Sequence, residues 1–171
     1  MIGGSWDYTC RLSRIHRLAF NGTHESLKRL DIRTPIVDNS HNIDGDYDLF
    51  KAIHTLESLE TLYISDTLLT TIPDSAIQSH TKLVNINFES NPIVRIGSQA
   101  FKHLPHLRNL DIRRNKIHDI SDNAFPVNDV YSDEKLVIDL TANLLSNGTV
   151  GKYAFDAIKR PVDLYLYNED L

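Results

Sequence analysis

The chain has 171 residues, of which 41% are hydrophobic and 24% charged, and this average composition excludes the intrinsically disordered, collagen-like and coiled-coil classes. Its net charge of −5 disfavours attraction to nucleic acid or to an anionic membrane. No apolar run approaches the roughly 20 residues that cross a bilayer, and the first residues lack the basic region and apolar stretch of a signal peptide. We therefore predict a soluble domain with no membrane span and no nucleic-acid partner.

The N-terminal segment is the least regular part of the sequence. Apolar residues with the spacing of a strand occur at Ile15, Leu18 and Phe20. A clearer strand, with Leu27, Leu30 and Ile32, follows closely. We predict an N-terminal capping region over residues 1–26 and regular structural units over residues 27–171.

An insertion separates this first strand from the next one. The next apolar unit begins only at Leu59, about eight residues later than the 24-residue period of the following units predicts, so we place the insertion at about residues 37–58. Asp48 is a suitable helix N-cap, and the residues after it form one apolar helical face, namely Leu49, Phe50, Ile53 and Leu56. We predict a short helix that begins near Leu49.

The insertion also contains the acidic stretch Asp44-Gly45-Asp46-Tyr47-Asp48, which resembles a calcium-binding sequence. An EF-hand loop beginning at Asp44 would need glycine at its sixth position and glutamate at its twelfth, but Leu49 and Thr55 stand there. We therefore predict a solvated acidic loop and no metal site.

From Leu59 onward, apolar residues recur with a period of 24 residues. The recurring sets are Leu59, Leu62, Ile64, Leu69 and Ile72, then Leu83, Ile86, Phe88, Ile93 and Ile96, then Leu107, Leu110, Ile112, Ile117 and Ile120. A longer unit follows over about residues 116–155, because extra residues fall between Pro126 and Glu134. A stretch of alternating apolar residues in an antiparallel sheet would not keep this period.

A polar residue stands at one phase of these units, at Thr67, Asn91, Asn115 and Asn143. The backbone groups of a turn at this phase face away from water, so an asparagine amide there can donate and accept hydrogen bonds between neighbouring coils. Three units end in an alanine–phenylalanine pair, at Ala100-Phe101, Ala124-Phe125 and Ala154-Phe155. We predict a structural ladder of polar side chains and a layer of phenylalanines between the coils.

This pattern, LxxLxLxxN followed by xLxxIxxxAF, resembles the leucine-rich repeat of the 24-residue class that is common in extracellular and receptor proteins. The resemblance covers about residues 15–171. It implies an α/β leucine-rich-repeat solenoid with a curved parallel sheet on its concave face and irregular or short helical segments on its convex face.

A narrower resemblance lies in the last third of the chain. The segments Asn143-Leu144-Leu145, Tyr153-Ala154-Phe155 and Arg160-Pro161-Val162-Asp163-Leu164 are similar to arthropod extracellular repeat proteins related to the non-catalytic subunit of a decapod-shrimp luciferase (oplophorus-luciferin 2-monooxygenase). This resemblance implies a secreted interaction protein without enzymatic activity. The chain departs from those proteins because it lacks paired capping cysteines and a leader.

The last predicted strand contains Val162, Leu164 and Leu166. A terminal coil without a cap would expose its apolar face, so we expect the chain to be a fragment of a longer protein. The alternative is that Tyr165, Tyr167 and the acidic pair at 169–170 form a partly polar cap.

Strand side chains alternate between faces, so the residues between the strand leucines are predicted to point outward from the concave sheet. We expect the partner-binding residues among them to be Tyr63, Asn87, Glu89, Asp111, Arg113, Arg114, Tyr165 and Tyr167. Arginine and tyrosine are enriched in interface hot spots, although a solvated face with local ion pairs is the alternative. Because this face offers only about 300 Å², less than the roughly 800 Å² of a standard interface, flanking loops would have to contribute.

Signals for the cellular compartment conflict. Cys10 is the only cysteine, so no disulfide forms within the chain, as in a protein of a reducing compartment. Two glycosylation triplets, at Asn21 and Asn147, favour secretion instead. We predict a secreted or extracellular protein-binding module, with an intracellular regulatory scaffold as the alternative.

Nothing in the sequence indicates catalysis. No nucleophile, base and orienting group converge at compatible positions of the repeat, and the close pair His103 and His106 flanks Pro105 in a predicted exposed turn. We therefore predict no enzymatic activity, no cofactor and no metal. The sequence indicates neither the identity of the protein partner nor the oligomeric state.

Overall fold

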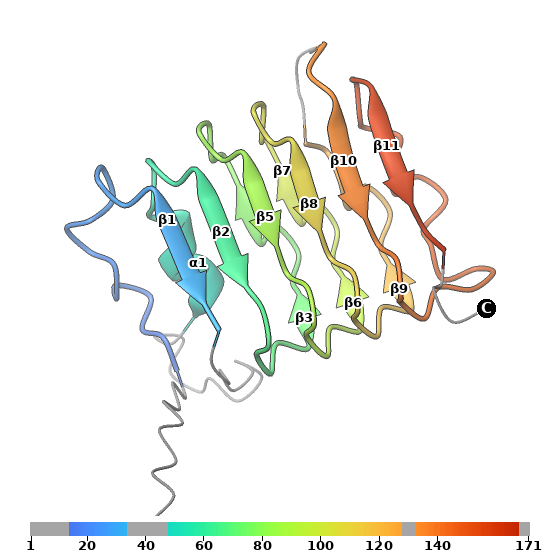
Figure 1. Cartoon of the computed structure of the whole chain (residues 1–171), viewed down its shortest axis with the longest axis horizontal. Helices are drawn as coiled ribbons and strands as arrows, with labels where there is room; N and C mark the ends of the chain where they lie inside the picture. The colour runs from blue at the N-terminus through green and yellow to red at the C-terminus, as the bar shows by residue number, and fades with distance from the viewer. Residues whose placement is uncertain (1–13, 34–47, 128–132, 168–171) are drawn as a thin grey trace, which may run out of the picture.

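The computed structural model describes residues 14–33, 48–127 and 133–167, which form a parallel β-solenoid (Figure 1). Its main sheet has six strands in the order β1-β2-β5-β8-β10-β11. These strands are β1 (Arg29–Ile32), β2 (Thr61–Ile64), β5 (Asn85–Asn87), β8 (Asn109–Asp111), β10 (Leu136–Asp139) and β11 (Val162–Tyr165). They lie side by side from blue β1 to red β11 in Figure 1.

The register of the main sheet follows the sequence period. Leu62 pairs with Ile86, Ile86 with Leu110, and Leu110 with Ile138. The extra residues of the long unit lie before β10, so its apolar residues stay in register with those of β8. Because a slip of one residue would turn every side chain to the other face, this register keeps the leucine and isoleucine side chains inside.

The side of the solenoid opposite the main sheet contains short parallel strands. One small sheet consists of β3 (Thr71–Ile72), β6 (Arg95–Ile96) and β9 (Asp119–Ile120), and a second of β4 (Ile77–Gln78) and β7 (Phe101–Lys102). Among the described residues, helix is confined to α1 (Leu49–His54). The buried isoleucines Ile72, Ile96 and Ile120 stand at the same position of successive coils and pair with one another, so this side forms short strands. The fold is thus a parallel β-solenoid with little helix.

Helix α1 forms at the predicted position. The Asp48 side chain accepts a hydrogen bond from the backbone amide of Lys51 at 3.1 Å, which caps the free amides of the first turn. Leu49, Phe50 and Ile53 are buried, so the predicted N-cap and apolar face are confirmed.

A row of phenylalanine rings runs through the solenoid. The ring centroids of Phe88 and Phe101 are 6.4 Å apart, those of Phe101 and Phe125 are 5.5 Å apart and those of Phe125 and Phe155 are 4.9 Å apart. Phe50 of α1 joins the row at 6.4 Å from Phe88. These contacts tie the coils together along the axis.

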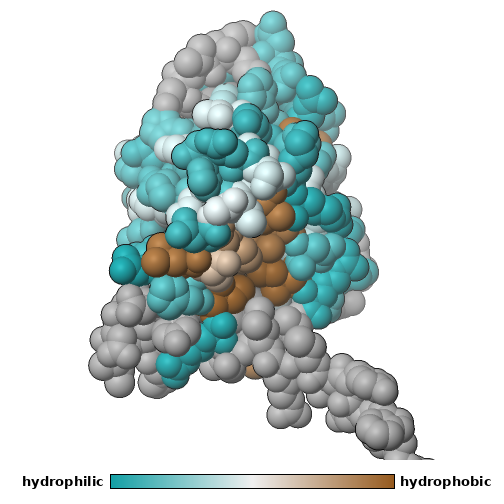
Figure 2. All heavy atoms as spheres, turned by 90° about the vertical axis from the view of Figure 1, so that its left-hand side faces the viewer, coloured by the Kyte–Doolittle hydropathy of each residue, from teal (hydrophilic) through white to brown (hydrophobic). Residues whose placement is uncertain are grey.

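The N-terminal segment differs from its predicted strand. Ile15 is buried, but Leu18 is 51% exposed, and residues 17–22 form turns, with Ala19 and Asn21 donating backbone hydrogen bonds to His16 and Leu18. The glycine at 22 and the short polar residues around it favour turns over a strand. At this end an apolar hollow of about 340 Å³ lies beside Phe20, and Figure 2 shows apolar side chains gathered on the same side of the molecule.

Several predictions concern residues outside the described ranges. They are residues 44–47 of the acidic stretch, Cys10 and the acidic pair at 169–170. No helix within 14–33, 48–127 or 133–167 is long and apolar enough to cross a bilayer.

Candidate protein-binding face

The outward side chains of the main sheet form what we call the sheet face, which comprises two rows of residues. The first row is Asp31, Tyr63, Asn87, Asp111, Asp139 and Tyr165, which the strand pairing places side by side. The second row lies two residues further along each strand, at Arg33, Ser65, Glu89, Arg113, Thr141 and Tyr167.

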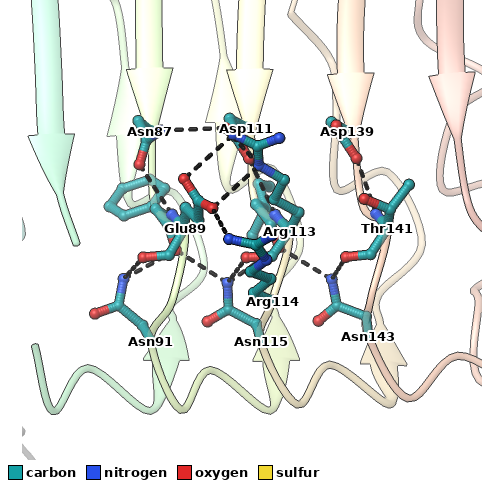
Figure 3. A network of polar contacts seen from close by, with 12 residues as sticks. Asn87, Glu89, Asn91, Asp111, Arg113, Arg114, Asn115, Asp139, Thr141 and Asn143 are labelled. Carbon is teal, nitrogen blue, oxygen red and sulfur yellow. Dashed lines mark hydrogen bonds and ion pairs between the residues drawn. The ribbon is translucent and has the colours of Figure 1, made fainter. Parts of the chain in front are cut away.

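An ion-pair network occupies the centre of the sheet face (Figure 3). Arg113 Nε lies 3.3 Å from Glu89 Oε1 and 3.2 Å from Asp111 Oδ2. Arg114 Nη1 lies 3.2 Å from Glu89 Oε1. Four of the predicted partner-binding residues thus contact one another, and the fifth, Asn87, donates to Asp111 Oδ2 at 3.1 Å.

The same local turn holds three neighbouring side chains of the first row. Asn87 Oδ1 accepts the amide of Glu89, Asp111 Oδ1 that of Arg113, and Asp139 Oδ1 that of Thr141, at 3.0 to 3.2 Å. These bonds satisfy backbone donors where the chain leaves the sheet. They also fix the orientation of the first-row side chains before any partner is bound.

Burial and neighbouring charges shift the electrostatics of this network. Burial raises the pKa of the Asp111 carboxyl, the carboxylates of Glu89 and Asp139 raise it further, and the hydrogen bond from the Arg113 amide and the Arg113 charge oppose the rise. The charge of Asp111 in turn raises the pKa of Arg113. The three carboxylates of Glu89, Asp111 and Asp139 outnumber the two arginines, so the centre of the sheet face carries a net negative charge at neutral pH.

The polar ladder lies just beneath the network. Asn115 Nδ2 donates to the carbonyls of Phe88, Ile112 and Arg113 at 2.9 to 3.0 Å, and its Oδ1 accepts the amide of Ile93 at 3.2 Å. The asparagine thereby satisfies buried backbone groups of two neighbouring coils.

The other ladder positions bond in a related way. Asn143 Oδ1 accepts the Ile117 amide at 3.0 Å. Asn91 Oδ1 accepts both the amide and the hydroxyl of Thr67, at 2.8 and 2.6 Å. Thr67 Oγ1 accepts the Leu69 amide at 3.2 Å, which is the partial substitute that a hydroxyl can provide.

Tyr63 lies at the β1 side of the sheet face, among charged residues. The guanidinium of Arg29 lies over its ring, 4.5 Å from the centroid, and that of Arg33 lies 5.7 Å away. Both arginines also pair with Asp31, at 2.9 Å. The pKa of Asp31 is lowered. The hydrogen bond from the Arg29 side chain is the largest cause, the hydrogen bond from Arg33 and the charges of both arginines add to it, and burial opposes it.

The tyrosines at the β11 side contact each other. The rings of Tyr165 and Tyr167 meet edge to face with centroids 6.4 Å apart, and both are exposed. Their side chains form no hydrogen bond with Glu89, Asp111 or Arg113. Thr141 occupies the outward position between Arg113 and Tyr167. It is only 2% exposed, so a partner cannot contact it there.

A hollow of about 310 Å³ lies on the sheet face between Tyr63 and Asp139. Its lining includes a further row of residues that lie two positions before the first row on each strand, namely Asn85, Asn109 and Val137. Sequence reasoning missed this row, although the same alternation of strand faces that identified the first row would have found it.

Both glycosylation triplets lie in similar exposed turns. Thr23 Oγ1 donates to the Phe20 carbonyl and Thr149 Oγ1 to the Ser146 carbonyl, each at 2.8 Å. The glycines inside the triplets have φ of +91° and +84°. Asn21 and Asn147 are both exposed.

The histidine pair for which we predicted an exposed turn has one exposed member, His106, and one half-buried member, His103. No group of three or more histidine, cysteine, aspartate or glutamate side chains suited to a metal ion occurs within the described ranges.

Comparisons with known proteins agree with this fold. A leucine-rich-repeat family model matches residues 81–126. Leucine-rich repeat-containing G-protein coupled receptor 5 of Xenopus tropicalis is 41% identical over 59 residues, which are 34% of this chain and 6% of the receptor. Tsukushi-A of Xenopus laevis is 28% identical over 117 residues, 66% of this chain and 32% of that protein.

Tsukushi of Xenopus tropicalis is 29% identical over 92 residues, which are 54% of this chain and 25% of that protein. The chain thus spans less than a third of the length of these relatives. Together with the 24-residue period and the solenoid, the comparisons show that the chain carries leucine-rich repeats, distantly similar to these receptor and Tsukushi sequences.

Proposed function

We propose that the sheet face binds a protein partner and that the chain has no enzymatic activity. The observation that carries this proposal is the central network, in which Glu89, Asp111 and Arg113 hold one another in place on an outward surface. Side chains that are fixed before binding lose less conformational entropy in a complex. The relative described as a G-protein coupled receptor also favours an interaction role.

The residues of this interface are proposed to be Tyr63, Asn87, Glu89, Asp111, Arg113 and Arg114 at the centre, and Tyr165 and Tyr167 at the β11 side. Thr141, which lies between these two groups, is buried and offers no contact. Flanking loops supply the remaining area that a standard interface needs.

We also propose that the protein is secreted or extracellular and carries glycans on Asn21 and Asn147. The support is that both asparagines are exposed and lie in polar turns. Asn21 precedes β1 and Asn147 follows β10, so neither is part of the sheet face. The narrower resemblance to arthropod extracellular repeat proteins remains a prediction.

Affinity capture with matched variants tests the interface. The chain and two variants are immobilised and exposed to secreted and membrane proteins from its own source. Arg113→Glu reverses a central charge of the sheet face, and Arg95→Glu reverses a half-exposed arginine on β6. The proposal expects a protein that the parent chain and Arg95→Glu retain and that Arg113→Glu loses; retention by all three would contradict it.

Mass spectrometry of the native protein, before and after removal of N-linked glycans, tests the location. A mass loss that maps to Asn21 or Asn147 supports secretion. Unmodified asparagines and a free Cys10 thiol would instead favour the intracellular scaffold.

A further inference from the structure

The hollow on the sheet face is sized for one long side chain. Its volume of about 310 Å³ lies at the lower end of the roughly 300–1,000 Å³ range of small-molecule pockets. It is open to solvent, and its lining includes Asn85, Asn109 and Val137 together with Tyr63 on β2 and Asp139 on β10. A single residue that projects from a partner would fill such a space.

The carboxylates at the centre of the sheet face differ in which groups they bind. Glu89 pairs with Arg113 and Arg114, and Asp111 pairs with Arg113 and accepts a hydrogen bond from Asn87. Asp139 accepts only the Thr141 amide, through Oδ1, and within the described ranges no lysine, arginine or histidine pairs with it. Its second oxygen therefore remains an acceptor on the wall of the hollow.

Charge also favours a cation in this position. Two carboxylates, Asp111 and Asp139, and one guanidinium, that of Arg113, line the hollow, so one negative charge is left over. Burial raises the pKa of the Asp111 carboxyl most, and repulsion from the carboxylates of Glu89 and Asp139 raises it further. A cation beside Asp139 would relieve that repulsion.

The shape of the hollow distinguishes arginine from lysine. The Tyr63 ring and the linked carboxamides of Asn85 and Asn109, joined by a 2.7 Å hydrogen bond, are planar groups. A guanidinium is planar, weakly hydrated and able to bind a carboxylate with two hydrogen bonds, whereas an ammonium is compact and strongly hydrated. Arg29 of this chain already lies over the Tyr63 ring in this way.

We propose that the hollow receives an arginine side chain of the partner protein, with Asp139 as its main ion-pairing residue. This inference rests on the proposed function and adds the chemistry of the partner to it. The partner accordingly presents an exposed arginine in a projecting turn or strand.

The test uses the full chain and small probes in an NMR titration. The probes are the N-acetyl, N-methylamide derivatives of arginine, lysine and citrulline, the last being the uncharged analogue of arginine. The inference expects saturable shifts of the Asn109 and Val137 amide signals with the arginine probe and an affinity about fivefold or more lower for the other two probes. Equal shifts with the citrulline probe would overturn the cation, and equal shifts with the lysine probe would overturn the choice of arginine.

Two variants complete the experiment. Asp139→Asn keeps the oxygen that accepts the Thr141 amide but removes the charge, and it should weaken the arginine probe about fivefold or more. Asp119→Asn, on β9, removes an exposed carboxylate outside the hollow and should leave the affinity unchanged. If Asp139→Asn binds the arginine probe as tightly as the parent chain while Arg113→Glu still abolishes partner capture, this inference alone is overturned. If Arg113→Glu still captures the partner, the proposed function itself is overturned.

Discussion

The side-chain amide of Asn115 donates to the carbonyl of Phe88 at 2.9 Å, across the boundary between two neighbouring coils. The same amide group also bonds to two carbonyls of its own coil, and its oxygen accepts the Ile93 amide. One buried side chain therefore connects the backbone of the β5 coil to that of the β8 coil.

Replacing Asn115 with alanine should lower the free energy of unfolding by about 2–4 kcal/mol, because several buried backbone groups would lose their partners. Urea unfolding followed by circular dichroism measures the change. Asn85→Ala, at a position that lines the hollow, should change stability by about 0.5 kcal/mol or less. Equal stabilities for the two variants would show that the ladder does not hold the coils.

Removing a ring from the phenylalanine row should be more costly. Phe101 is fully buried between Phe88 and Phe125, so Phe101→Ala should destabilise the fold by about 3–5 kcal/mol through loss of contacts and a residual cavity. Leu144→Ala truncates a side chain that is 59% exposed and serves as the control. Thermal melting compares them, and a wild-type melting curve for Phe101→Ala would contradict the register of the repeat.

Gly97 is required by close packing of two coils. A Cβ atom at this position would lie 2.7 Å from the carbonyl carbon of Pro73, well inside contact distance. Gly97→Ala should therefore destabilise the fold, and truncating the neighbouring Asp74 to alanine in the same chain should not restore stability, because the backbone of Pro73 remains in the way. Full recovery in the double variant would mean that only the Asp74 side chain is in conflict.

Buried His80 should make stability depend on pH. Burial is the main cause that lowers its pKa, the hydrogen bond to the Leu56 carbonyl opposes this, and the charge of His54 adds to the lowering, so that the pKa is about 4. Above pH 6.5 the imidazole is neutral in both states. As pH falls from about 6.5 to about 4, the unfolded chain binds a proton that the folded chain does not, so stability is lost.

The size of this effect follows from the lowered pKa of His80. This pKa lies about 2.5 units below its ordinary value, and each unit corresponds to about 1.4 kcal/mol, so the full loss of stability is about 3–4 kcal/mol. His80→Leu should flatten the pH dependence between pH 6.5 and 4 relative to the parent chain, measured by urea unfolding at each pH. His54→Ala, at an exposed position, should retain most of it; identical curves for the parent and His80→Leu would contradict the assignment.

The sequence predicts the solenoid and its register because each coil repeats the same local signal. Leu62, Ile86 and Leu110 stand at one phase, and the structure pairs them in that order. The asparagine phase is equally visible, since one amide satisfies the same buried backbone groups in successive coils. The helix after Asp48 is predictable as well, because its cap and apolar face are local features.

Other features depend on contacts between coils that no single segment encodes. The two-residue strands at Ile72, Ile96 and Ile120 arise only when the coils stack. Leu18 has the spacing of a strand residue but lies in a turn and is exposed. The free oxygen of Asp139 is equally hidden from sequence reasoning, because it depends on which arginines the neighbouring carboxylates hold.

Hydrogen–deuterium exchange of the chain, alone and with its purified partner, tests the central claim most directly. A partner on the sheet face should slow exchange at amides of β5, β8 and β10 and at the turn residues Glu89 and Arg113, while β6 and β9 exchange as in the free chain. Slowed exchange confined to β3, β6 and β9, with the sheet face unchanged, would contradict the account.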